Sequence, residues 1–230
     1  MELSFESITL AASFLTCAYL TFYAFTPPVP DSKNKWEKDS LMRFQDPRRR
    51  AISTAVILTV WSYHTLLILI PPSTPSLLCP YPSRLNPKYF TWNPYTLFFI
   101  ALILIAAPIR FLAYKQLGQN FTFTLAKPKR LVKTGMYRYV RHPSYPTLFA
   151  CQVGMGALLL RWGGVAGCWM PAWLAGWRIL GLGAMVAQGL ATAFLLGVRV
   201  REEEEMLSST FGEEWEEYAR KTKRFIPFVV

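Results

Sequence analysis

The sequence predicts an all-helical integral membrane protein with about five transmembrane helices. Hydrophobic residues make up 52% of the 230 residues, and they gather in long blocks instead of alternating with polar residues as in a half-buried strand. A bilayer core about 30 Å thick needs roughly 20 apolar residues of helix. Five blocks meet or approach this length, near residues 7–26, 51–70, 94–113, 143–160 and 179–198.

The first block is expected to be a span and not a cleaved signal peptide. The chain begins with Glu2 and Glu6 where a signal peptide carries basic residues, and no small-residue cleavage site follows the block. We therefore expect one membrane-embedded domain over residues 1–230, with N-terminal spans in 1–113 and a second half in 114–230.

Basic residues are spread unevenly between the loops that join these blocks. The linker after the first block and the segment before the fourth block are rich in lysine and arginine, whereas the loop 71–93 carries only Arg84 and Lys88. Because cytosolic loops are enriched in basic residues, this bias predicts an N-terminus on the outer side of the membrane. It also places segments 114–142 and 199–224 together on the cytosolic face.

Composition excludes several classes of function. The formal net charge is +11, but basic residues beside membrane spans are explained by topology and anionic headgroups, so no nucleic acid partner is expected. The four cysteines show no metal-binding spacing, so no metal is expected. Three of them lie in or beside apolar blocks, where a thiol packs as a small hydrophobic side chain. GxGxxG and GxSxG motifs are absent from the sequence, which excludes the soluble cofactor-binding folds.

Two polar residues in the apolar blocks have ordinary structural interpretations. His64, in the second block, is expected to be a packed and hydrogen-bonded core histidine. Arg110, at the cytosolic end of the third block, is expected to snorkel toward the membrane surface. Neither residue is predicted to belong to a site.

Prolines and polar side chains mark the entrance to the fourth block, in the stretch 137-YRYVRHPSYP-146. Pro143 and Pro146 fall in the expected first turn of the helix, where backbone N–H groups have no intrahelical partner, so neither proline removes a hydrogen bond. The remaining N–H groups and the positive end of the helix dipole lie beside Arg141 and His142, and they suit a carboxylate or a phosphate. An interfacial aromatic belt has the same composition, and position alone leaves both interpretations open.

A second polar segment follows the fifth block and begins 199-RVREEEEM-206. Its consecutive glutamates cover every side of a helix and mark where the fifth helix leaves the membrane. Arg199 and Glu203 are four residues apart and share a helical face, as in solvated salt-bridge ladders and in binding sites alike. Downstream, a helix with Trp215 and Tyr218 on one face is expected to lie on the interface or over the polar loop.

The combination of these segments resembles a known enzyme family. The runs 131-LVKTGMYRYVRHPSY-145 and 203-EEEMLSSTFGEEWEEY-218 resemble the isoprenylcysteine carboxyl methyltransferases, and more loosely the wider group that includes the phospholipid N-methylases. The resemblance covers about the C-terminal half of the chain. It implies S-adenosylmethionine-dependent methylation at the cytosolic face of the endoplasmic reticulum. The implied partners are membrane lipid and, as acceptor, a prenylated protein or a small lipidic acid.

The same resemblance implies roles for individual residues and makes 114–230 the catalytic half. It implies that Arg199, as the catalytic and substrate-binding residue, holds the acceptor's carboxylate. Glu203 would anchor the cofactor's amino group or orient Arg199, and His142 with the helix start would receive the cofactor's carboxylate. The implied cofactor-binding residues are Lys129, Arg130, Leu131, Val132, Tyr137, His142, Pro143, Ser144, Tyr145 and Glu203.

The chemistry of a carboxylate acceptor agrees with these residue types. A carboxylate with a pKa of about 4 is ionised at neutral pH, so ester formation needs alignment and no general base. Three alternatives remain open: N-methylation of phospholipid headgroups, an NADPH-dependent sterol reductase, whose group has a similar Arg-His-x-x-Tyr element, and a non-catalytic membrane scaffold. The mass of the methylated product distinguishes the phospholipid reaction. Transfer of a labelled methyl group excludes the reductase, and cofactor binding excludes the scaffold.

Overall fold

The computed structural model describes residues 4–28, 36–40, 46–70, 77–175 and 178–226. All named elements in these ranges are helical, and Val140 and Lys223 form an isolated parallel bridge. The main helices are α1 (Phe5–Phe25), α2 (Pro47–Leu69), α3 (Pro94–Leu117), α4 (Ser144–Leu159), α6 (Arg178–Phe211) and α7 (Glu213–Lys221), and a short α5 covers Ala172–Ala175. The all-helical prediction is confirmed.

A helix lies at each of the five predicted blocks, but the five are not equally long. In the described ranges α1, α2, α3 and α6 are long and apolar enough to cross a membrane. Helix α4 has 16 residues, which at 1.5 Å per residue is about 24 Å. Four candidate spans are therefore found, and the predicted count of five is not confirmed.

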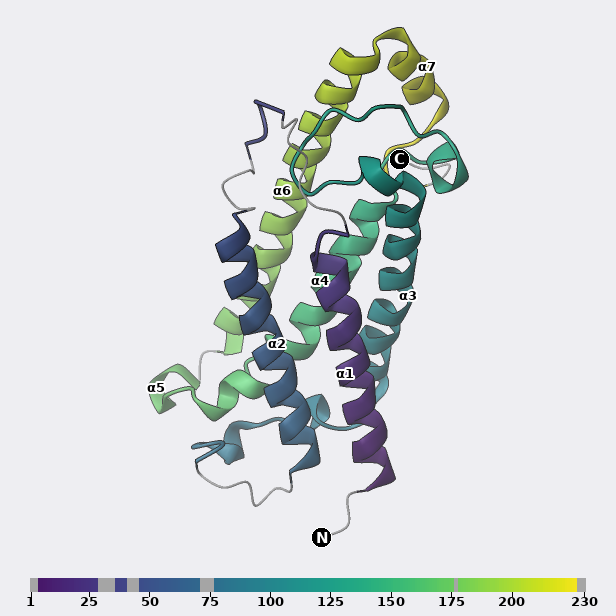
Figure 1. Ribbon diagram of the computed structural model, residues 1–230. Coiled ribbons are helices and arrows are strands. Elements are labelled where there is room, and N and C mark those ends of the chain that lie inside the picture. The colour runs from purple at the N-terminus through teal and green to yellow at the C-terminus, as the bar shows by residue number, and fades with distance from the viewer. Residues whose placement is uncertain (1–3, 29–35, 41–45, 71–76, 176–177, 227–230) are drawn as a thin grey trace.

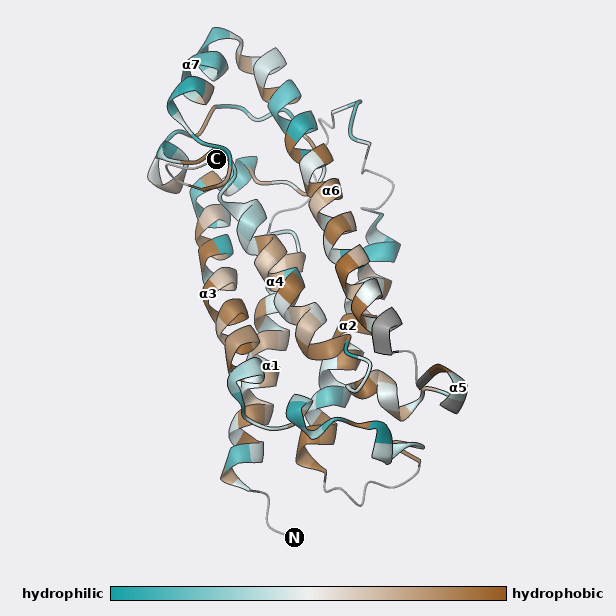
Figure 2. Ribbon diagram, turned by 180° about the vertical axis from the view of Figure 1, so that it is seen from behind, coloured by the Kyte–Doolittle hydropathy of each residue, from teal (hydrophilic) through white to brown (hydrophobic). Residues whose placement is uncertain are grey.

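Helices α1, α3 and α4 pack side by side along the bundle (Figure 1). Their shared core includes Phe14, Ile103 and Leu158, and α2 adds Trp61 to it; all four side chains are buried. Gly154 permits the close approach of α4 to α3, because a Cβ atom at this position would lie 2.7 Å from Cγ1 of Ile103. Large apolar side chains also cover the outer faces of the bundle, and polar residues collect toward its ends (Figure 2). This distribution suits a bundle surrounded by lipid.

Local sequence signals explain where the helices begin. Asn93 caps α3 through its side chain, which accepts hydrogen bonds from the N–H groups of Tyr95 and Thr96, and Pro94 occupies the first helical position. Helix α4 begins directly after Pro143, close to the predicted start. The proline-containing entrance therefore fixes the position of the helix that carries the predicted cofactor residues.

His64 is the packed core histidine that the sequence predicts. Its ring is fully buried, stacks at 4.6 Å from the rings of both Phe14 and Phe90, and places Nε2 2.9 Å from the carbonyl oxygen of Tyr89. It therefore ties α2 to the turn before α3.

The two polar segments predicted to share one face do lie together, at the end of the bundle that carries α7 (Figure 1). The opposite end is closed by residues 77–93 and by the connection that follows α4. There Cys79 and Cys168 form a disulfide. The expectation that most of the cysteines pack as free hydrophobic thiols is therefore wrong for this pair, although Cys17 and Cys151 are free and buried. Two cysteines separated by 89 residues give no spacing signal.

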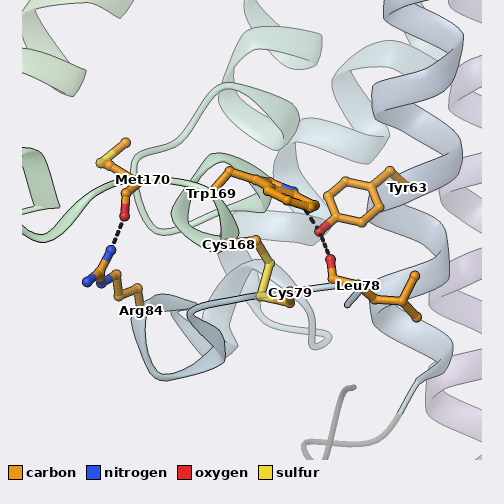
Figure 3. Close-up of a disulfide and its surroundings, with 7 residues drawn as sticks. All are labelled: Tyr63, Leu78, Cys79, Arg84, Cys168, Trp169 and Met170. Carbon is orange, nitrogen blue, oxygen red and sulfur yellow. Dashed lines mark hydrogen bonds between the residues drawn. A yellow bond between two sulfur atoms is a disulfide. The ribbon is translucent and has the colours of Figure 1, made fainter. Parts of the chain in front are cut away.

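Hydrogen bonds surround the disulfide (Figure 3). Tyr63 on α2 donates its hydroxyl to the carbonyl oxygen of Leu78 at 2.6 Å and accepts from the indole N–H of Trp169 at 3.1 Å. Arg84 donates to the carbonyl oxygen of Met170. The loops on either side of the bridge are thus fastened to each other and to α2.

Candidate functional site

A cavity of about 780 Å³ opens at the polar end of the bundle. Its walls come from α3, α4, α6, α7 and the irregular stretch 118–142. One part of its lining is apolar and comes from the bundle helices, with Phe25, Leu148, Leu195 and Leu196. Another part is polar and charged. The cavity can therefore accept a ligand that has both an apolar and an ionic part.

Most of the residues implied by the resemblance line this cavity. The lining includes Arg130, Leu131, Val132, Tyr137, His142, Ser144, Tyr145, Arg199 and Glu203. Lys129 and Pro143 are not among its lining residues. Residues from two segments about 60 positions apart thus meet around one space, as the sequence predicts for a shared site.

The chain after α7 is joined to the entrance of α4 by backbone hydrogen bonds. The N–H of Arg141 donates to the carbonyl of Lys223 at 2.8 Å, and the N–H of His142 donates to the carbonyl of Arg224 at 2.9 Å. Tyr218 on α7 donates its hydroxyl to the carbonyl of Tyr137 at 2.7 Å. These bonds hold α7 over the stretch that carries the Arg-His-Pro-x-Tyr motif.

A glycine makes the reversal between α6 and α7 possible. Gly212 has a φ of 53°, a left-handed backbone conformation that glycine adopts without the steric cost of a Cβ atom. The turn brings Trp215 and Tyr218 to the cavity wall, and both side chains are buried. The aromatic face predicted for this helix therefore packs over the polar loop.

Glu203 and Glu204 surround the ring of His142. The hydroxyl of Tyr145 donates to Oε2 of Glu203 at 2.8 Å, and Nδ1 of His142 lies 3.6 Å from the same oxygen. On the other side of the ring, Nε2 lies 3.3 Å from Oε1 of Glu204, whose second oxygen is 2.6 Å from Nη2 of Arg224. His142 therefore faces two acids, and its predicted contact with the cofactor's carboxylate stays a prediction.

Arg199 is paired with an acid that the sequence analysis did not select. Its Nη1 lies 2.9 Å from Oδ2 of Asp39, and its Nη2 donates to the carbonyl of Phe123. The side chain of Asp39 is only 1% exposed, and its Oδ2 also accepts the N–H of Leu125 at 2.8 Å. A second bond, from the N–H of Trp36 to the carbonyl of Leu125 at 2.7 Å, holds the same linker segment in place. The buried ion pair thus joins the linker after α1 to α6.

Arg110 does not snorkel, and the earlier interpretation is wrong. The residue is 1% exposed. Its Nε donates to the carbonyl of Ala24 at 2.8 Å, and its Nη1 donates to the carbonyl and the hydroxyl of Ser144 at 2.9 and 2.5 Å. It lines the cavity and bridges the end of α1 to the start of α4. The buried carbonyl oxygens accept the hydrogen bonds of the guanidinium at the point where the helices converge. The side chain therefore does not extend to the membrane surface.

Burial shifts the phenols that hold α7 toward the neutral form. Burial raises the pKa of Tyr218 to about 12, and it raises the pKa of Tyr137 well above its ordinary value of about 10. Both hydroxyls therefore remain protonated donors at neutral pH, and neither is suited to act as a base.

The charge on the cavity wall favours an anionic ligand. Among the described lining residues the arginines are Arg110, Arg130, Arg141 and Arg199, while Glu203 is the carboxylate. Asp39 and Glu204 compensate part of this charge from positions behind the wall. No group of three His, Cys, Asp or Glu side chains suited to a metal ion is found in the described ranges.

Sequence reasoning missed Arg110 and Asp39. The position of Arg110 within an apolar block could have revealed its role, since an arginine well inside an apolar helix needs partners there. Asp39 carried no such signal, because it lies in a linker whose basic residues dominate the pattern. Its role depends on how the linker folds back over α6.

Comparisons with known proteins agree with the resemblance. A sequence model of the isoprenylcysteine carboxyl methyltransferase (ICMT) family matches residues 99–181. The protein-S-isoprenylcysteine O-methyltransferase of Xenopus laevis is 28% identical over 146 residues, which are 62% of this chain and 43% of the relative. The enzyme of the same name from Schizosaccharomyces pombe is 28% identical over 147 residues, 61% of this chain and 52% of the relative.

A plant relative gives the same result. The probable protein-S-isoprenylcysteine O-methyltransferase of Oryza sativa subsp. indica is 28% identical over 134 residues, which are 56% of this chain and 60% of the relative. The chain thus spans about half the length of the curated relatives that it matches. The match begins within α3 and includes the whole Arg-His-Pro-x-Tyr stretch that lines the cavity. The resemblance to the isoprenylcysteine carboxyl methyltransferase family seen in the sequence is confirmed.

Proposed function

We propose that this protein is an S-adenosylmethionine-dependent carboxyl methyltransferase whose acceptor is a prenylated cysteine or a similar lipidic acid. The observation that carries the proposal is the single cavity whose wall is apolar along the bundle helices and cationic toward the polar end. An acceptor with an isoprenoid chain and a free carboxylate matches both parts. The names of the relatives support the same reaction.

The residues on the wall fit S-adenosylmethionine as cofactor. Its amino group is cationic, and Glu203 offers a carboxylate that is held in position by the hydroxyl of Tyr145. Leu131, Val132 and Trp215 provide apolar surface for an adenine ring. When bound, S-adenosylmethionine supplies an electrophilic methyl group on a sulfonium. We propose Arg130, Leu131, Val132, Tyr137, His142, Ser144, Tyr145 and Glu203 as its binding residues on the wall, with Lys129 and Pro143 acting from the adjoining backbone.

The protein's own part in the reaction is alignment and exclusion of water. A carboxylate acceptor is ionised without help, so no residue has to remove a proton. Arg199 stays the candidate for holding the acceptor's carboxylate, and to do so it has to exchange Asp39 for the acceptor. Helix α7 and residues 118–142 cover the cavity and separate the charged groups from bulk water, which strengthens the electrostatic interactions within it.

Methyl transfer tests the proposal directly. Purified protein in detergent is incubated with S-adenosylmethionine labelled in its methyl group and with N-acetyl-S-farnesylcysteine. We expect label in the farnesylcysteine fraction that is released as methanol by mild base, as a carboxyl methyl ester requires. Base-stable label in phospholipid would identify the N-methyltransferase alternative. Absence of transfer, with normal folding and bound cofactor, would contradict the proposed reaction.

We also propose five spans in the endoplasmic reticulum membrane, with the cavity and α7 on the cytosolic side. The bias of basic residues supports this orientation, and so does the position of the disulfide at the other end, since disulfides persist in oxidising compartments. A glycosylation acceptor inserted in 77–93 should be modified in microsomes, whereas one inserted in 118–130 should not. The reverse pattern would invert the orientation.

A further inference from the structure

Arg110 is the buried charge that the proposed reaction does not yet use. It lies two helical turns before the end of α3 at Leu117, about 10 Å along the helix axis. Its protein partners are neutral: the carbonyl of Ala24 and the carbonyl and hydroxyl of Ser144. The ring of Tyr114 lies beneath it, 4.7 Å from Cζ to the ring centroid. An arginine at this depth is normally compensated by an opposite charge.

No carboxylate compensates it within the described part of the chain. No aspartate or glutamate oxygen there lies within 4.0 Å of its guanidinium nitrogens. The other buried arginine on the cavity wall, Arg199, has Asp39 as its counterion. Arg110 is therefore the buried cation on this wall that an anionic ligand would neutralise.

Part of its hydrogen-bonding capacity is also unused. Nε and Nη1 donate to protein oxygens, but Nη2 makes no hydrogen bond to any described residue. The N–H groups on Nη2 can donate charge-assisted hydrogen bonds to a carboxylate. Because Ala24 and Ser144 hold the other donors, the side chain is already oriented before a ligand binds, and little conformational entropy remains to be lost.

We propose that Arg110 forms an anion subsite within the cavity and that its ligand is a carboxylate. The inference rests on the proposed function, in which two ligands carry that group. Among the other cations of the wall, Arg199 is the candidate for the acceptor, Arg141 pairs with Glu204 and Arg130 is exposed, so Arg110 is the buried cation open to the cofactor's carboxylate. Ser144, which Arg110 contacts, belongs to the stretch implied in cofactor binding. We therefore expect the cofactor's carboxylate, and the acceptor's carboxylate is the other source to be tested.

The test compares ligands that differ in the carboxylate. In the cofactor arm, binding of S-adenosylhomocysteine is compared with binding of methylthioadenosine, which lacks the amino-acid part. In the acceptor arm, N-acetyl-S-farnesylcysteine is compared with its amide. Arg110→Gln removes the charge and keeps a polar side chain. We expect it to weaken binding of one carboxylate ligand by about 10–100-fold, as the loss of a charged hydrogen bond usually does. The affinity for the matched carboxylate-free ligand should not change.

Two further variants separate this role from a purely structural one. Arg110→Lys keeps the charge without the planar fork, so it should lose only part of the affinity for the same carboxylate ligand. Arg161→Gln is the matched control, because Arg161 is partly buried near Tyr89 and Tyr95 and does not line the cavity. It should bind all four ligands as the wild type does.

The outcomes decide the proposal in each case. A loss confined to S-adenosylhomocysteine assigns the cofactor's carboxylate, and a loss confined to the farnesylcysteine acid assigns the acceptor's. Equal losses for acid and carboxylate-free ligands, or no loss, would overturn the subsite and leave Arg110 as a brace between α1 and α4. If the Gln variant does not fold, the Lys variant decides by the same comparison.

Failure of the proposed function gives a different result. Wild-type protein would then bind neither nucleoside nor farnesylcysteine, and the subsite is tested with a long-chain fatty acid and its amide. Preference of the wild type for the acid, reduced in Arg110→Lys, would support an anion subsite in a protein of another function. Equal affinity for acid and amide would overturn it.

Discussion

The two ends of the helical bundle are closed by different interactions. At the disulfide end, a covalent bond between Cys79 and Cys168 and hydrogen bonds to carbonyl and hydroxyl groups join the loops (Figure 3). At the cavity end, ion pairs such as Asp39 with Arg199 and hydrogen bonds such as Tyr218 with Tyr137 hold α7 and the linker in place. A covalent bond does not respond to a ligand, whereas an ion pair can exchange one partner for a ligand. The difference supports the proposal that the disulfide end is scaffold and the cavity end is the site.

The largest expected effect comes from removing one half of the buried ion pair. Arg199→Met removes one half of the buried ion pair with Asp39, and such a loss costs about 3–5 kcal/mol. We expect a large fall in the thermal unfolding midpoint in detergent. The double variant Arg199→Met with Asp39→Asn should recover much of the loss, because both charges of the pair are removed together. A double variant as unstable as the single one would show that the pair is not coupled.

The disulfide should affect stability without affecting ligands. Replacing Cys79 and Cys168 by serine removes a cross-link across 89 residues, for which about 2–4 kcal/mol is usual. Affinity for S-adenosylhomocysteine should stay at the wild-type value, because the bridge lies at the end away from the cavity. Weakened cofactor binding in a variant that is still folded would mean that the two ends are not independent.

A smaller effect is expected where α7 is fastened. Tyr218→Phe removes the hydrogen bond to the carbonyl of Tyr137 and leaves that acceptor buried, which costs about 1 kcal/mol. The comparison is Tyr139→Phe, because Tyr139 is exposed and the same hydroxyl is lost there. Unfolding midpoints of the two variants should differ by a few degrees. Equal midpoints would indicate that α7 does not depend on this contact.

The same contrast explains which features could be predicted from the sequence. Blocks of apolar residues and the prolines at helix starts are local signals, so the five helices and the entrance at Pro143 were predictable. The shared face of 114–142 and 199–224 followed from the alternation of spans. The disulfide was not predictable, because Cys79 and Cys168 become neighbours only through the fold. The family resemblance contributed most of the individual site residues.

The contacts at the site that were not foreseen have one physical cause. The position of Arg110 suggested a charge that reaches for water, but Ala24 and Ser144 provide buried acceptors from two other helices. Arg199 was expected to hold the acceptor's carboxylate, and its pairing with Asp39, from a linker more than 150 residues away, was not foreseen. His142 was expected to receive an anion, and the glutamates that face both of its ring nitrogens were not foreseen. Helical spacing along one segment cannot reveal counterions that come from another.

Cofactor binding to two neighbouring glutamate variants tests the central claim most directly, which is that the cavity is the cofactor site. Glu203 lines the cavity and accepts the hydroxyl of Tyr145, whereas Glu205 on the same helix pairs with Lys38 at the surface. Calorimetry with S-adenosylhomocysteine should show affinity about 10–100-fold weaker for Glu203→Gln, as the loss of a charge-assisted hydrogen bond predicts, and unchanged for Glu205→Gln. Wild-type affinity in Glu203→Gln, or equal losses in both variants, would contradict the account.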